Sequence, residues 1–237
     1  MAFQYGVRFC SMGAGETNKF AASLQELLRK CGINPRSKPI PKQQLHEIED
    51  RLGIPVPQTL LTFATMFSTH RFARCHDRFL RPSEWHVERN ALVFAEENQG
   101  VVFWATRIEA DHDDPAVVQG NPDEPRWYPE SRHLSSFLLK AVCWQAVNGW
   151  MKHRHTVNLR KKDAQDRFRD LTPVCQPESR PEMDMRAFVT DGLCVCVAYH
   201  QRNALIKIGE RTRRIVNDFC GAYGLEEYDG PPEFDLS

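Results

Sequence analysis

The sequence lacks the features that mark several classes of protein. No apolar run approaches the roughly 20 residues that cross a bilayer, and no charged leader followed by a long apolar stretch marks a secretory signal. Basic and acidic residues both number 31, so no excess charge favours nucleic acid or an anionic membrane as partner. With 41% hydrophobic residues in 237, the composition is that of a globular protein, which we expect to be cytoplasmic and without a membrane partner.

Signatures of catalysis are also missing. The chain contains no G-x-S-x-G, no P-loop and no G-x-G-x-x-G. Cys75, His76 and Asp77 are of the types found in nucleophilic sites, but catalytic partners meet through the fold and not as neighbours in sequence. We therefore predict no catalytic residues and no cofactor. An enzyme remains the third alternative, and it would require a pocket that joins Cys75, His76 or His200 to a carboxylate.

The eight cysteines show no C-x-x-C spacing, and in the cytosol they are expected to be reduced. Cys194 and Cys196 alternate along a predicted strand, which places both thiols on one face, packed as small apolar groups under a sheet. His153 and His155 would share one face of a strand, but the basic residues beside them would repel a cation. The sequence therefore predicts no metal site.

Helical spacing of apolar residues predicts three helices in the first third of the chain, over Thr17–Cys31, Lys42–Leu52 and Gln58–Thr69. Between the second and third lies the run Gly53-Ile54-Pro55-Val56-Pro57. A glycine that ends a helix and two prolines that favour extended backbone make this run a structural joint between helices.

Two β-rich runs, Ala91–Phe94 and Val101–Trp104, predict adjacent antiparallel strands. The polar link between them, Glu96–Gly100, sits beside the most apolar strands of the chain, so it is a natural rim for a binding surface. A short aromatic strand at Arg126–Tyr128 and a helix over Leu134–Asn148 follow.

A change in composition marks the end of this region. Basic residues concentrate between Met151 and Arg169, and we interpret the segment as a partly helical connector with a solvated face. Only Phe168 is available there to stack on a base, which argues against nucleic acid; docking against the acidic tail Glu226–Asp235 is an open alternative. Beyond it we predict a hairpin turning at Asp191-Gly192, a strand over Ala204–Ile208 and a helix over Glu210–Tyr223. The predicted divisions are a helical extension (1–38), a core (39–150), the connector (151–182) and strands with a helix that extend the same domain (183–237).

The order of these features between Pro39 and Val147 resembles the SUKH superfamily, which includes fungal cell-wall-synthesis regulators and bacterial immunity proteins of toxin systems. The resemblance is carried by the helix–GIPxP–helix unit, the ENQG link between strands and two tryptophans. The residues we assign to this structural motif are Gly53, Ile54, Pro55, Pro57, Gly100, Trp104 and Trp127.

The resemblance implies an α+β fold with a central antiparallel sheet flanked by helices, here with a C-terminal extension made of a hairpin and a helix. It also implies a non-catalytic role in binding a protein. Bacterial members look like proteins that bind and block a cognate toxin, often a nuclease, and this is our leading hypothesis. The alternative is a regulatory scaffold of the fungal type. Fold alone does not decide between them.

Acidic and amide residues of two turns are the candidate partner-binding residues, because they would complement the basic cleft of a nuclease if both turns lie on one side of the sheet. They are Glu96, Glu97, Asn98, Gln99, Glu109, Asp111, Asp113 and Asp114. The competing interpretation is that these are solvated turn residues that satisfy nearby backbone groups. We expect Trp104 and Trp127 to lie in the core; an exposed tryptophan would instead be an interface anchor.

Overall fold

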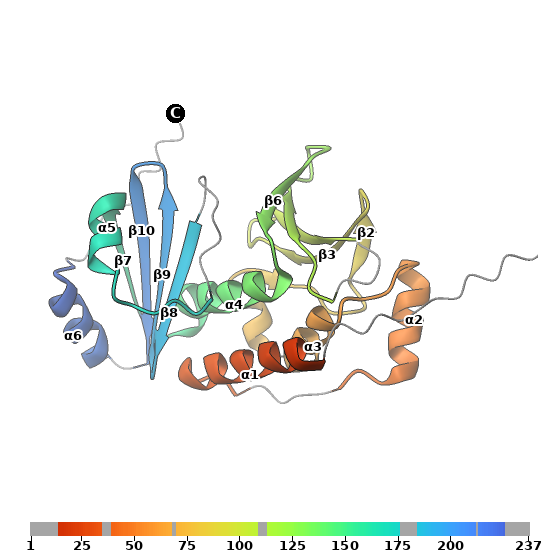
Figure 1. The fold of residues 1–237 in the computed structure, drawn as a ribbon, viewed down its shortest axis with the longest axis horizontal. Coiled ribbons are helices and arrows are strands. Elements are labelled where there is room, and N and C mark those ends of the chain that lie inside the picture. The colour runs from red at the N-terminus through yellow and green to blue at the C-terminus, as the bar shows by residue number, and fades with distance from the viewer. Residues whose placement is uncertain are drawn as a thin grey trace, which may run out of the picture.

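The computed structural model describes residues 14–34, 39–67, 70–108, 113–175, 184–211 and 213–225. They form an α+β fold with two antiparallel sheets, as predicted for the fold class (Figure 1). The helices are α1 (Ala14–Lys30), α2 (Lys42–Leu52), α3 (Gln58–Phe67), the 3₁₀ turn η1 (Arg71–Arg74), α4 (Leu134–Gln145), the π-helical turn η2 (Ala146–Trp150), α5 (Lys161–Arg167) and α6 (Arg213–Tyr223).

The first sheet has six strands in the order β1-β3-β4-β5-β6, with β2 also pairing with β3. Its strands are β1 (Arg78–Phe79), β2 (His86–Glu88), β3 (Ala91–Glu96), β4 (Phe103–Arg107), β5 (Val117–Gly120) and β6 (Trp127–Ser131). The predicted pair of strands around the ENQG link is β3 and β4. Every residue of β3 from Ala91 to Ala95 is buried, so this strand is covered on both faces.

The GIPxP run joins α2 to α3 as its composition requires. Gly53 adopts the left-handed conformation with φ +69°, and its N–H closes the helix on the Glu49 carbonyl. The Glu49 side chain accepts a hydrogen bond from the Val56 N–H at 3.0 Å, which fixes the extended bridge that follows. Helix α3 then begins at Gln58 and is buried along most of its length.

Helix α4 lies between the two sheets (Figure 1). It is apolar on almost all sides, and this pattern is typical of a helix without a solvent face. Towards the first sheet, the ring of Phe137 lies 5.7 Å from Phe94 and 5.8 Å from Trp104. Towards the second sheet, the Cys143 carbonyl accepts from the Cys194 thiol at 3.7 Å. Among the residues that the structure describes, no helix is long and apolar enough to cross a membrane.

The second sheet has the order β7-β10-β9-β8 and lies on the far side of α4, with α5 and α6 on its other face (Figure 1). Its strands are β7 (His153–Arg160), β8 (Asp184–Thr190), β9 (Leu193–His200) and β10 (Asn203–Glu210). Cys194 and Cys196 are fully buried in the core shared with α4, as predicted from their alternation. Val195 and Val197 point the opposite way, into a second core beneath α5 and α6.

The observed elements fill in the predicted divisions of the chain. The segment 151–182 contributes the edge strand β7 and helix α5. The strands after residue 183 pair with β7 in a sheet of their own. In the predicted helical extension, Leu24, Leu27 and Leu28 of α1 pack into the main core beside α3 and α4. Basic side chains obscured β7, since charged residues are common on edge strands.

Close contact between the second sheet and η2 depends on a glycine in β10. A Cβ atom at Gly209 would lie 2.9 Å from both the Val147 Cα and the Met151 Sδ atoms. We predict that Gly209→Ala lowers the free energy of unfolding by about 2 kcal/mol, because backbone must shift to admit the methyl group. Urea denaturation would measure this. The control is Gly221→Ala in α6, where a Cβ meets nothing within 4 Å and helix propensity predicts a gain of up to about 1 kcal/mol. Equal stability of the two variants would contradict the prediction.

Candidate functional site

Polar groups from three parts of the chain meet beside the junction of the two sheets. They come from the segment after η1, from the link between β3 and β4, and from the last turn of α4. We call this the junction cluster, made of His76, Asp77, Glu97, Asn98 and Trp144. Asn98 Nδ2 lies 3.1 Å from His76 Nδ1, and the rings of His76 and Trp144 are 6.2 Å apart in an edge-on arrangement.

The segment that carries His76 and Asp77 is held by one buried amide. Gln145 has no exposed surface, although it lies in the most apolar part of the chain. Its Oε1 accepts from the Asp77 N–H at 2.8 Å, and its Nε2 donates to the carbonyls of Asp77 at 2.8 Å and Phe72 at 3.2 Å. These bonds satisfy backbone groups that would otherwise be buried without a partner. We call this set of bonds the Gln145 clamp.

Directly after Gln145 the helix widens into the π-helical turn η2, a feature that is frequent near functional sites. This turn brings Gly149 against the segment after η1, so closely that a Cβ atom there would lie 2.2 Å from the Cys75 carbonyl oxygen. Only glycine permits this approach. The Cys75 thiol donates to the Gln145 carbonyl at 3.5 Å, which adds a third point of attachment.

The link itself is tied down although it is exposed. The Glu97 N–H donates to the Val102 carbonyl at 2.8 Å and the Gly100 N–H to the Glu97 carbonyl at 2.9 Å. The Glu97 carboxylate accepts from the Gln99 N–H at 2.8 Å, and Asn98 Nδ2 lies 3.1 Å from His76 Nδ1. The side chains of Asn98 and Gln99 remain exposed, as does Val101 at 52%.

Burial dominates the electrostatics of the cluster. It raises the pKa of Asp77 to about 6, although the hydrogen bond from the Asn98 N–H acts in the opposite direction. Burial also lowers the pKa of His76; the Glu97 carboxylate opposes this effect, and the charges of Lys207 and Arg154 reinforce it. Asn98 Nδ2 lies 3.1 Å from His76 Nδ1 and 3.5 Å from Nε2, and Nε2 lies 3.9 Å from the Asp77 carboxylate.

The neighbouring thiol has none of the properties of an activated nucleophile. Burial raises the pKa of Cys75 to about 11, so the group is a thiol at neutral pH. Its hydrogen bond goes to a main-chain carbonyl and not to an imidazole that could act as base. The Cys75-His76-Asp77 sequence therefore serves here to connect the Gln145 clamp to the link.

The predicted acidic rim does not form one surface. Glu96 pairs opposite Phe103 and Ala91 opposite Arg107, so the link and the residues after Arg107 lie at opposite ends of β3 and β4, separated by about 14 Å of strand. Glu96 is in an ion pair with Arg78 at 3.2 Å.

At the other end, Asp114 accepts from the N–H and hydroxyl of Ser135 at 2.6 and 2.7 Å, which caps the first turn of α4. The Asp113 carbonyl accepts a hydrogen bond from the Thr59 N–H. Glu109 and Asp111 lie outside the described residues. Consecutive strands of an antiparallel sheet are connected at alternate ends of the sheet. The β3–β4 link and the β4–β5 connection therefore lie at opposite ends.

Both motif tryptophans are half-buried and pack against the main core. Trp127 stacks edge-on against Phe103 at 5.1 Å, and its indole N–H donates to the Arg89 carbonyl at 3.1 Å. The Arg89 guanidinium lies over both rings. Arg89 was not singled out from the sequence; it occupies a left-handed turn position, φ +48°, that glycine or asparagine usually fills.

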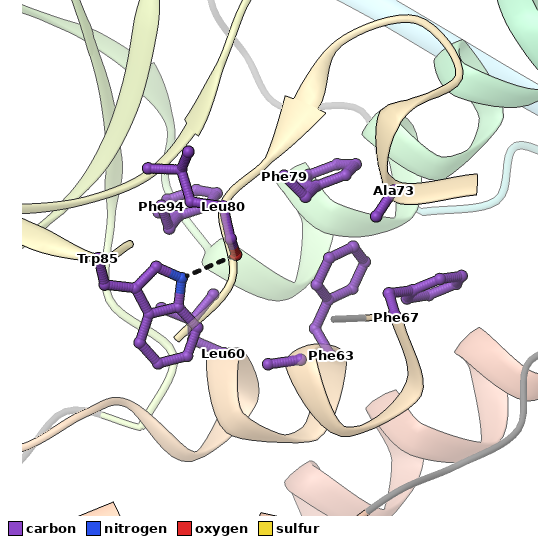
Figure 2. Close-up of a pocket in the computed structure, with 9 residues that line it drawn as sticks. Leu60, Phe63, Phe67, Ala73, Phe79, Leu80, Trp85 and Phe94 are labelled. Atoms are coloured by element: carbon purple, nitrogen blue, oxygen red, sulfur yellow. Dashed lines mark hydrogen bonds between the residues drawn. The ribbon is translucent and has the colours of Figure 1, made fainter. Parts of the chain in front are cut away.

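Neither metal ligation nor a ligand cavity is apparent in the described part of the chain. His153 and His155 do lie on strand β7, but no group of three or more ligating side chains among the described residues is arranged to hold a metal ion. An apolar cavity of about 10 Å³ lies between α3, β1 and β3. Figure 2 shows Phe63, Phe79 and Trp85 among the residues that line it. That volume is near the lower limit for one water molecule, so the cavity belongs to the packed core.

Comparison with known proteins found no match: no protein-family model, no curated protein and no solved structure is similar to this chain.

Replacing the clamp residue tests its structural role. We predict that Gln145→Leu lowers the free energy of unfolding by about 3 kcal/mol, because the Asp77 N–H and carbonyl lose their partner inside the core. The matched control is Gln43→Leu, at an exposed position of α2, which should change stability by less than about 0.5 kcal/mol. A loss below about 1 kcal/mol for Gln145→Leu would show that the segment is held by other contacts.

The raised pKa of Asp77 predicts a pH dependence of stability. Between the unfolded value of 3.8 and the folded value of about 6, the folded state binds more protons, so this group's contribution falls as pH rises through that window. Asp77→Asn removes the buried charge. We expect its stability relative to the parent to be nearly unchanged at pH 4 and greater by up to about 3 kcal/mol at pH 7.5.

Denaturation at the two pH values measures this difference. Asp170→Asn, at an exposed position, controls for the loss of one negative charge. A difference between the Asp77→Asn variant and the parent that does not change with pH would contradict the assigned burial of the Asp77 carboxylate.

Proposed function

We propose that this chain is a non-catalytic protein-binding protein of SUKH type that acts as an immunity protein: it binds a cognate toxin domain and blocks it. In this proposal the link Glu97–Val101 is the centre of the contact. The order of elements from α2 to α4 follows the pattern on which the SUKH resemblance rests, and this agreement supports the proposal without identifying the partner.

The observation that carries the proposal is a loop that is both fixed and exposed. Side chains and backbone hold the link at both ends, while Asn98, Gln99 and Val101 face solvent. A surface that is already ordered loses little conformational entropy when it binds, so more of the contact energy appears as affinity. An exposed aliphatic side chain that follows two exposed amides along the chain supplies an apolar contact with polar groups near it.

Charge has a smaller part in this contact than the sequence suggested. Arg78 neutralises Glu96, and the Asp114 carboxylate is committed to capping α4. Of the acidic residues that the structure describes, Glu96 and Asp114 are therefore engaged within the chain and do not add to a free acidic face. Shape and hydrogen bonding at Asn98, Gln99 and Val101 are the better-supported means of recognition.

A capture experiment tests the proposal. The chain is co-expressed with the products of the genes adjacent to its own, and we expect a toxin domain to co-purify and lose its toxicity. Val101→Glu places a charge in the centre of the contact and should weaken binding at least 30-fold. The matched control is Val87→Glu on β2: Val87 is 40% exposed and pairs near the far end of β3, so binding should change less than twofold.

Equal binding by the two variants would remove the link from the interface. Co-purification of a regulatory protein in place of a toxin would favour the scaffold alternative, and absence of any bound product would contradict the immunity role.

A further inference from the structure

Two cationic side chains lie next to the junction cluster on neighbouring strands. Lys207 of β10 pairs opposite Thr156 of β7, and Gly209 pairs opposite Arg154. Residues two apart on a strand share a face, so Arg154 and Lys207 are diagonal neighbours, about 7–8 Å apart at their Cα atoms. Their face is the one that carries Gly209 against η2, opposite the face covered by α5 and α6.

These two cations border the junction cluster directly. The Arg154 guanidinium donates to the Asn148 carbonyl, one residue before the glycine that touches Cys75. Both charges act on the neighbouring His76 ring, whose pKa they lower together with burial. Lys207 is half-buried; burial lowers its pKa, and the charge of Arg154 lowers it further. Arg154 is thus held beside η2, which touches the segment of His76, and His76 in turn lies 3.1 Å from Asn98 Nδ2.

No carboxylate within the described residues forms an ion pair with either cation. Other arginines of the chain do meet one: Arg29 pairs with Glu26, Arg74 with Glu84 and Arg78 with Glu96. Two neighbouring positive charges repel each other, and the half-buried one has lost part of its hydration. An incoming anion would relieve both effects, and hydrogen bonds to charged groups are among the strongest in proteins.

We propose that Lys207 and Arg154, with Asn98 beside them, bind a carboxylate side chain of the protein partner. This inference rests on the proposed function, since the link then contributes the adjoining part of the same contact. A protein carboxylate is favoured over a nucleic-acid backbone because acidic groups also lie close to His76: the Asp77 carboxylate is 3.9 Å from its Nε2, and the Glu97 charge acts on its pKa. A single carboxylate can reach the two cations, whereas a chain of phosphates would also meet these acidic groups.

The test uses the full chain and three probes, and it does not require the toxin. The first two are the blocked peptides acetyl-Ala-Glu-Ala-amide and acetyl-Ala-Gln-Ala-amide, and the third is a single-stranded oligothymidine. NMR signals of the Lys207 ammonium and Asn98 amide groups are followed at low salt. We expect saturable shifts with the glutamate peptide in the low millimolar range and none with the glutamine peptide. The Arg154→Gln/Lys207→Gln variant should bind at least fivefold more weakly.

The matched control removes an arginine and a lysine elsewhere, in Arg160→Gln/Lys162→Gln, and should change binding less than twofold. Arg154 is exposed, so Arg154→Gln alone, expected to weaken binding at least threefold, serves if the double variant does not fold. Equal shifts with both peptides, no saturable shift, or unchanged binding by the variants would overturn the proposal. Tighter binding of oligothymidine at the same signals would assign the site to nucleic acid instead. The titration with peptides needs no toxin. A negative titration therefore overturns the carboxylate site alone, whereas a negative capture experiment overturns the proposed immunity role.

Discussion

The buried amide of Gln145 is the interaction on which the rest of the candidate site depends. It lies at the end of a helix that has no solvent face, and it can be accommodated there only because the backbone of Phe72 and Asp77 satisfies it. The same hydrogen bonds hold in place the segment that carries His76 and Asp77. Asn98 Nδ2 then lies 3.1 Å from His76 Nδ1, so the position of an exposed loop is set from inside the core.

Helix α4 connects the candidate site to both sheets, because both sheets pack on this helix. Phe137 faces the first sheet and Cys143 the second, and η2 continues the helix to the point where Gly149 and Gly209 allow close approach. The link of the first sheet and the cations of the second are thereby placed side by side without a direct strand pairing between the sheets. A binding surface assembled from two sheets over one shared helix has little freedom to change shape.

Local signals were sufficient for most elements. Apolar spacing identified α2 to within a residue, and the alternation of Cys194 and Cys196 gave their shared buried face. Strand β7 was missed because its only fully buried side chain is Val157 and charged neighbours mask the pattern. Predicting an acidic rim requires knowing at which end of the sheet each turn lies. The composition of the sequence does not give this information. A signal for the clamp was present: Gln145 is the polar residue within the apolar run from Ala141 to Val147.

The central claim is that the link is held rigidly by the core, and amide hydrogen exchange tests it most directly. The N–H groups of Gln99 and Gly100 lie in an exposed turn but donate to the carboxylate and the carbonyl of Glu97, at 2.8 and 2.9 Å. We predict that both exchange at least 100-fold more slowly than in an unstructured peptide, corresponding to local opening that costs about 3 kcal/mol. Exchange of these two amides at the rate of an unstructured peptide, in a protein whose β3 amides remain protected, would contradict the account.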